Sequence, residues 1–158
     1  MNNLKFRAYI KSINKVVDVL KIDFKSNTVV LDIDNDEVIS KPYWWYETRL
    51  NFEDVELMQS TGLKDKKGTE IFIGDIVKFP DLYGFYDFEG GLTSVDGFNV
   101  ASVVKKGNCI TLDNFAGGDG FTERELENYE CTFDDLDFKN FEVIGNIYEN
   151  KEPLENDR

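Results

Sequence analysis

The chain has 158 residues, a formal net charge of −13 and no histidine. Its length suits one domain with a core that needs no metal or disulfide crosslink, and a hydrophobic content of 41% argues against disorder. The absence of histidine excludes Ser-His-Asp and Cys-His catalysis and the usual zinc ligand sets. No apolar run approaches the roughly 18 residues that span a bilayer, and the N-terminus lacks the apolar core of a signal peptide. We therefore expect a cytoplasmic protein without a membrane segment.

The first patterned segments have a period of two, which predicts β-strands. Apolar and polar residues alternate in "LKIDF" (20–24) and in "TVVLDID" (28–34). The polar residues 25–28 between them predict a turn, so the two strands form a hairpin. The side chains expected to face the core are Leu20, Ile22, Phe24, Val29, Leu31 and Ile33.

The acidic run "DIDNDE" (32–37) has the first carboxylates of a calcium-binding EF-hand loop. Such a loop requires Gly at its sixth position and Glu at its twelfth, where this chain has Glu37 and Tyr43. We therefore interpret the run as a solvated strand end followed by a turn.

An aromatic cluster follows in "PYWWYE" (42–47). Packing into the core is one interpretation of Trp44, Trp45 and Tyr46. Contact with a partner or a second copy is the other, because exposed Trp and Tyr favour interfaces.

The stretch "KDKKGTEIFIGDIVKF" (64–79) predicts a charged turn, a short strand, a second tight turn and a further strand. Gly68 and Gly74 supply the backbone freedom that such turns need. We expect the Asp75 carboxylate to bind the chain's own backbone rather than a substrate.

Further along, "KKGN" (105–108) predicts a turn between antiparallel strands at 101–105 and 109–113. Ile110 and Leu112 are expected to face the core. Cys109 is expected to be a partly buried strand residue rather than a nucleophile. Together with Cys131 it fits reduced thiols better than a disulfide.

The C-terminal part, residues 119–158, is strongly acidic, with 13 acidic and 4 basic residues, a net charge of −9. Interspersed apolar residues predict that it is folded up to about Tyr148, with short helical turns within 122–140 and a strand at 141–148 bulged at Gly145. We expect its carboxylates to form a negative surface that steers a basic partner. The candidate contacts on this surface are Glu123, Glu125, Glu127 and Glu130.

Taken together, these elements predict a mainly β fold of short antiparallel strands with one or two short helical turns, such as a small SH3-like barrel. We expect a single domain over residues 1–150, with an inserted lobe around 81–135 as an open alternative. The charged residues 151–158 are expected to fray.

Three segments of the chain resemble the YopX family of phage and prophage proteins. They are "LKFRAY" (4–9), the set "LMQ", "TGLKD", "G", "EI" and "GDIV" within 57–77, and "FEVIGNIYEN" (141–150). The sequence departs from the family pattern at Ser60 and at residues 151–152, and residues 81–135 carry no match. The resemblance implies a β-rich, phage-encoded protein in a bacterial cytoplasm, and it carries over no catalytic residue.

The sequence therefore favours a non-enzymatic accessory protein that binds a host or phage protein. Two alternatives stay open: an acidic mimic that occupies a host DNA- or RNA-binding protein, and a carboxylate- and Mg²⁺-dependent nucleotide-processing enzyme. No catalytic, cofactor-binding or metal-binding residue is assigned. The acidic surface disfavours direct nucleic-acid binding, whereas a homo-oligomer is compatible with the aromatic cluster.

Overall fold

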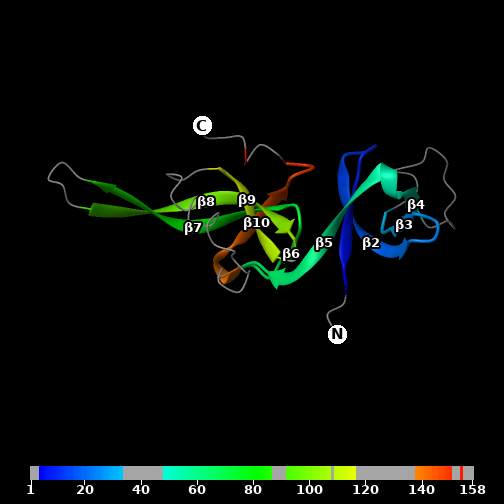
Figure 1. Cartoon of the computed structure of the whole chain (residues 1–158), viewed down its shortest axis with the longest axis horizontal. Coiled ribbons are helices and arrows are strands. Elements are labelled where there is room, and N and C mark those ends of the chain that lie inside the picture. Colours follow the sequence, from blue (N-terminus) through cyan, green and yellow to red (C-terminus); the bar gives the residue numbers. More distant parts are fainter. Residues whose placement is uncertain are drawn as a thin grey trace. The chain divides into compact units, whose positions relative to one another are not determined.

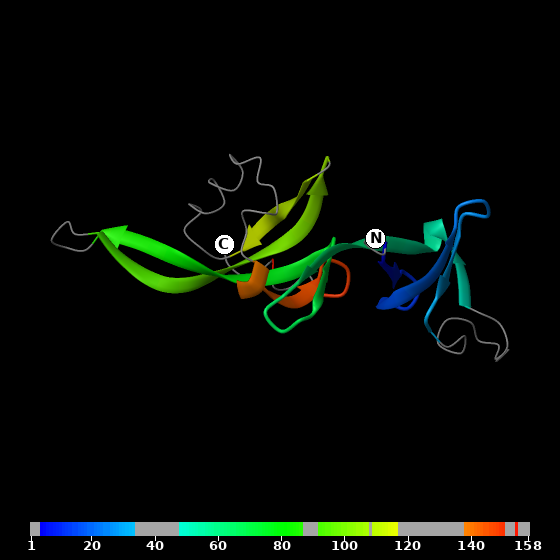
Figure 2. The same ribbon diagram turned by 90° about the horizontal axis from the view of Figure 1, so that it is seen from below.

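The computed structural model describes residues 4–33, 48–86, 92–107, 109–116, 138–150 and 154. Over these residues the chain consists almost entirely of antiparallel strands, which confirms the mainly β prediction (Figures 1 and 2). The strands form two sheets with open strand orders rather than a closed barrel. The chain divides into two compact units, Met1–Ser60 (unit 1) and Thr61–Arg158 (unit 2). The expected single domain over residues 1–150 stays a prediction.

Unit 1 is an antiparallel sheet with the strand order β4-β3-β2-β1-β5, in which β1 to β4 form a meander and β5 pairs with β1. The short 3₁₀-helix η1 (Phe52–Asp54) precedes the last of these strands. The strands are β1 (Phe6–Ile10), β2 (Lys15–Asp23), β3 (Thr28–Leu31), β4 (Thr48–Asn51) and β5 (Val55–Lys64), the last of which continues into unit 2.

The predicted hairpin of the first unit is confirmed, since β2 and β3 pair antiparallel from Asp23↔Thr28 to Val19↔Leu31. The Asp23 carboxylate accepts hydrogen bonds from the backbone N–H groups of Lys25 and Ser26, which fixes the turn. Asn27 has a φ of 54°, a left-handed conformation that Asn tolerates better than most residues.

The predicted alternation along β2 fails at Leu20, because a β-bulge lies there. Two steps along β2, from Val19 to Lys21, match one step along β3. A bulge adds one residue and so changes which residues face the core. Val19 and Ile22 pack on the core, whereas Leu20 is 61% exposed. Phe24, in the turn, is 75% exposed, so its predicted core position was also wrong.

The core of unit 1 is a compact aliphatic cluster between these strands, and it includes the predicted core residues Val29 and Leu31. Ile22 and Ile33 pack against it, as predicted. The buried members are Ala8, Ile10, Val17, Val29, Leu31 and Val55.

Unit 2 contains the end of β5, the short strand β6 beside it, and a four-stranded sheet in the order β10-β7-β8-β9. The 3₁₀-helix η3 (Phe138–Asn140) precedes the last strand. The strands are β6 (Glu70–Phe72), β7 (Asp75–Tyr86), β8 (Leu92–Lys106), β9 (Cys109–Ala116) and β10 (Glu142–Asn146).

The core of unit 2 combines aliphatic and aromatic residues. The Phe79 ring stacks on Phe141 with centroids 4.9 Å apart, and Phe115 meets Phe79 edge-on at 6.4 Å. Phe141 belongs to the acidic C-terminal part, so this contact confirms that at least one of its aromatics packs on the β core. The cluster is completed by Ile71, Val77, Ala101, Val103 and Leu112.

The predicted hairpin around "KKGN" is confirmed by the pairing of β8 with β9, from Lys106↔Cys109 to Val103↔Leu112. Leu112 is buried, and Ile110 is half-buried against the same core. Cys109 is exposed, so the prediction of a partly buried thiol was wrong. It is the first residue of β9, next to the turn, where little of the sheet covers it.

The predicted bulge in the last strand is also confirmed. Between Val143 and Gly145 the register of β10 shifts against β7 by one residue, which leaves Ile144 extra and 37% exposed. A Cβ on Gly145 would lie 2.9 Å from the Cβ of Asn150, so the close approach of the following turn requires glycine.

Candidate functional site

The residues proposed from the sequence as partner contacts lie outside the described residues. This applies to the aromatic cluster and to the acidic set, and their roles stay predictions. The residues concerned are Trp44, Trp45, Tyr46, Glu123, Glu125, Glu127 and Glu130.

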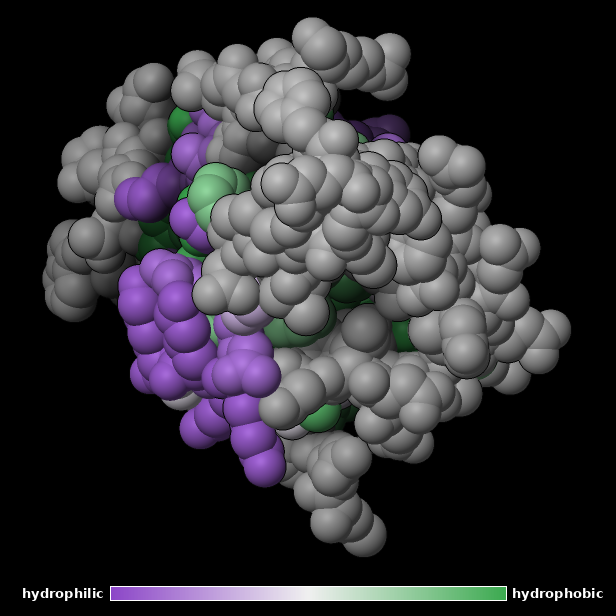
Figure 3. Space-filling view, turned by 90° about the vertical axis from the view of Figure 1, so that its left-hand side faces the viewer, coloured by the Kyte–Doolittle hydropathy of each residue, from purple (hydrophilic) through white to green (hydrophobic). Residues whose placement is uncertain are grey.

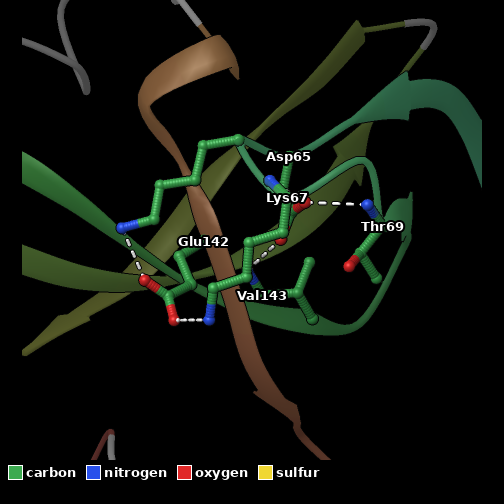
Figure 4. Close-up of polar contacts among 6 residues, drawn as sticks. Asp65, Lys67, Thr69, Glu142 and Val143 are labelled. Carbon is green, nitrogen blue, oxygen red and sulfur yellow. Dashed lines mark hydrogen bonds and ion pairs between the residues drawn. The ribbon is translucent and has the colours of Figure 1, made fainter.

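The most highly organised group of polar side chains in the described part of the chain surrounds Asp65, in the turn between β5 and β6 (Figure 4). This carboxylate is 6% exposed and accepts hydrogen bonds from the backbone N–H groups of Lys67 and Thr69 at 2.8 Å. Its second oxygen accepts a 3.1 Å hydrogen bond from the backbone N–H of Val143 in β10. Asp65 therefore shapes its own turn and binds that turn to a strand 78 residues further along the chain.

The backbone of the turn makes a further bond to the same strand region. The N–H of Lys66 donates to the carbonyl of Phe141 at 2.8 Å, and the N–H of Gly68 donates to the carbonyl of Asp65. Gly68 has a φ of 84°, the positive value that the sequence predicted. Together with Asp65, the turn occupies the carbonyl of Phe141 and the N–H of Val143, so these two groups are not available for pairing with another chain.

Two lysines of the turn meet one carboxylate of β10. The ammonium groups of Lys66 and Lys67 each form an ion pair with Glu142, and the Lys66 pair is 2.5 Å long. Figure 4 shows the Lys67 side chain reaching Glu142 from the turn. These three charged side chains (the clasp) form a second link between the turn and β10, in addition to the hydrogen bond between Asp65 and Val143.

The pKa values of both carboxyls follow from these contacts. Burial pushes the pKa of Asp65 upward, but the N–H donors of Val143, Thr69 and Lys67 outweigh burial, so its pKa lies below the usual value. Hydrogen bonds from Lys66 and then from Lys67 lower the pKa of Glu142 to about 2. Both groups are therefore ionised at neutral pH, with their charges already satisfied by the protein.

In the second tight turn of the stretch 64–79, a buried aspartate again accepts a hydrogen bond from the backbone. Gly74 lies between β6 and β7 with a φ of 92°, as predicted for a turn between strands. Asp75 is 1% exposed and accepts a 2.8 Å hydrogen bond from the backbone N–H of Phe72. The prediction that this carboxylate binds its own backbone is confirmed.

The turn after β10 is held by a buried amide. Asn146 is 6% exposed, and its side-chain oxygen accepts hydrogen bonds from the backbone N–H groups of Tyr148 and Glu149. Its amide group donates to the Glu149 carboxylate at 2.7 Å. The last matching segment of the sequence thus ends in a side chain that organises local backbone.

No group of three or more His, Cys, Asp or Glu side chains is arranged to hold a metal ion among the described residues. Within those residues, no helix is long and apolar enough to cross a membrane.

The sequence predicts the turn, its glycine and the closing strand, but not that Asp65 and Glu142 bring them together. The available signal was the pattern Asp65-x-Lys67-x-Thr69, in which an aspartate precedes two backbone donors in a glycine-containing turn. No local pattern indicated which distant strand the turn would meet.

The geometry connects the segments that carry the family resemblance, and the comparisons agree with it. The YopX protein family model matches residues 5–155, so the chain belongs to the YopX family. The fold also resembles the crystal structure of protein EF1440 from Enterococcus faecalis, with a TM-score of 0.56 and 23% sequence identity over 96% of this chain and 97% of that chain. No curated protein matches the sequence. Neither name states an activity, so these matches establish the family and the fold.

Proposed function

We propose that this YopX protein is a phage-encoded accessory protein that acts by contact with another protein in the bacterial host cell. The proposal rests on what the two aspartates of the family-matching segment within 57–77 bind. Asp65 and Asp75 are buried and accept hydrogen bonds from the chain's own backbone. A catalytic carboxylate must reach a substrate, so this use supports a binding role for the protein over chemistry at these residues.

The surface supplies the means of contact. The protein carries a net charge of −13, and a negative surface attracts basic partners at low ionic strength. Large apolar side chains are exposed as well, among them Leu20 and Phe24 in unit 1 and Phe98 in unit 2. On the face drawn in Figure 3, hydrophilic residues gather in one area, with small hydrophobic areas beside them.

One specific observation favours a second candidate, an acidic mimic that occupies a host DNA- or RNA-binding protein. Residues 119–158 have a net charge of −9, whereas residues 1–80, with 13 acidic and 12 basic residues, have a net charge of −1. A nucleic-acid mimic needs such a local concentration of negative charge.

A pull-down from host lysate at low and high salt tests the proposal. The bait is the full chain, and the matched control replaces Glu123, Glu125, Glu127 and Glu130 with Gln. A partner that the full chain retains at high salt supports an apolar contact, and a basic partner lost with salt and with the four charges supports mimicry. Metal-dependent turnover in a nucleotide screen, with no retained partner, would overturn both in favour of an enzyme.

A further inference from the structure

The hairpin of β7 and β8 continues beyond the four-stranded sheet of unit 2. The two strands pair over eleven register positions, from Ile76↔Ser102 to Tyr86↔Leu92. Strand β10 accompanies β7 only as far as Lys78, and β9 accompanies β8 only as far as Val100. In Figures 1 and 2 the green hairpin extends past β9 and β10 in both views. Among the described residues, segments 81–86 and 92–97 (the arm) have no third strand beside them.

A two-stranded ribbon is marginally stable in water, and three or more strands with an apolar face are needed for independent stability. The backbone register pairs Tyr83 with Val95 and Tyr86 with Leu92 along the arm. A third strand along either edge would convert this ribbon into a stable sheet.

The charge of the arm indicates what kind of strand it accepts. Residues 79–104 contain four acidic residues and no basic residue. The acidic residues within the arm, Asp81 and Asp96, occupy register positions on the two strands. A second copy would bring the same acidic arm and a net charge of −13, so like charges would oppose self-pairing.

We propose that the arm is the docking site for an extended basic segment of a partner protein, which adds to one edge of the arm as a third strand. The inference rests on the proposed function, because it names the surface and the partner chemistry of the protein contact. Main-chain hydrogen bonds along the edge provide affinity, and the excess of acidic over basic residues in this part of the chain favours a basic segment.

The test compares the full chain with a shortened chain in which residues 81–97 are replaced by Asn-Gly, a sequence suited to a two-residue hairpin turn. The probes are a labelled peptide of sequence KVKVKVKV, the same peptide N-methylated at alternate residues, and EVEVEVEV. N-methylation retains the charges but blocks strand pairing. Fluorescence anisotropy at about 0.05 M and about 0.5 M salt measures binding.

We expect KVKVKVKV to bind the full chain roughly tenfold more tightly than either other peptide, and the shortened chain to lose this binding. A double variant, Asp81→Asn with Asp96→Asn, retains the arm and should weaken binding of KVKVKVKV several-fold. This double variant provides the test if the shortened chain does not fold. Absence of peptide binding, or equal binding by the full and shortened chains or by the methylated peptide, overturns the inference. Dimerisation of the full chain that the shortened chain loses, measured by sedimentation, also overturns it, since the occupant of the arm is then a second copy. A lysate partner that the shortened chain still retains would leave the proposed function intact while refuting the arm.

Discussion

The two units of this protein are stabilised in different ways. The described core of unit 1 is aliphatic, and its buried polar residues are the two threonines Thr28 and Thr48. Unit 2 buries ionisable, amide and hydroxyl side chains beside its hydrophobic cluster. Asp65, Asp75 and Asn146 accept hydrogen bonds from backbone N–H groups. Ser102 donates a hydrogen bond to the carbonyl of Asp113 near the bulge between β8 and β9. These polar residues are Asp65, Asp75, Asn99, Ser102 and Asn146.

This contrast indicates that a family-matching segment can specify backbone geometry rather than chemistry. The core of unit 1 needs only apolar side chains at the right register, which many sequences supply. Unit 2 needs particular polar residues, because each buried N–H that loses its acceptor carries a desolvation penalty. The longest matching segment, within residues 57–77, accordingly contains Asp65 and Asp75.

The largest expected effect is a loss of stability in unit 1. Ile10→Ala removes a fully buried side chain from the aliphatic cluster and should lower the free energy of unfolding by about 2–5 kcal/mol. Urea denaturation measures the loss, and amide hydrogen exchange should locate it in β1 and β2. The control is Leu20→Ala at the exposed bulge, which should cost no more than about 0.5 kcal/mol. Equal losses would show that Leu20 faces the core and that the bulge is misplaced.

The next effect breaks unit 2 without touching its hydrophobic cluster. Asp65→Ala leaves the N–H groups of Lys67, Thr69 and Val143 without their acceptor, at an expected cost of about 2–4 kcal/mol. Faster exchange of the Thr69 and Val143 amides should accompany the loss. The matched control, Asp18→Ala in the exposed part of β2, should change stability by no more than about 0.5 kcal/mol. If the two variants unfold alike, polar residues do not distinguish the units.

A smaller effect tests the second turn of unit 2. Gly74→Val places a β-branched residue at a φ of 92° and should destabilise the protein by about 1–3 kcal/mol. Gly107→Asn is the control, because its φ of 63° is a left-handed value that Asn tolerates and no atom lies within 4 Å of the added Cβ. An unchanged urea midpoint for Gly74→Val would refute the strained turn.

The smallest effect concerns the clasp on β10 and appears as a pH dependence. The pKa of Glu142 is lowered to about 2, so its contribution is fully present above the ordinary value of 4.5 and is lost as the pH falls through about 2. Side-chain NMR titration should give this low value, and Lys66→Ala should raise it more than Lys67→Ala because Lys66 makes the larger contribution. A Glu142 pKa near 4.5 in the full protein would show that the clasp does not form in solution.

Most of the strands, two hairpins and the roles of the special glycines are predictable from the sequence. Period-two alternation, polar turns and Gly-Asp pairs act over a few residues, and the structure follows them at Gly68, Gly74 and Gly145. The sequence also identifies Asp75 as a backbone ligand, since an aspartate after a tight-turn glycine has backbone donors within reach.

Which segments meet, and where the alternation of apolar and polar residues breaks, depends on the tertiary structure. The bulge at Leu20 depends on the register of β2 against β3, and a shift of one residue changes which face every later side chain occupies. The bond between Asp65 and Val143 joins residues 78 positions apart, and the β7–β8 arm is defined by where β9 and β10 stop. Such features arise from pairing between distant strands, and local patterns contain no information about which strands become neighbours.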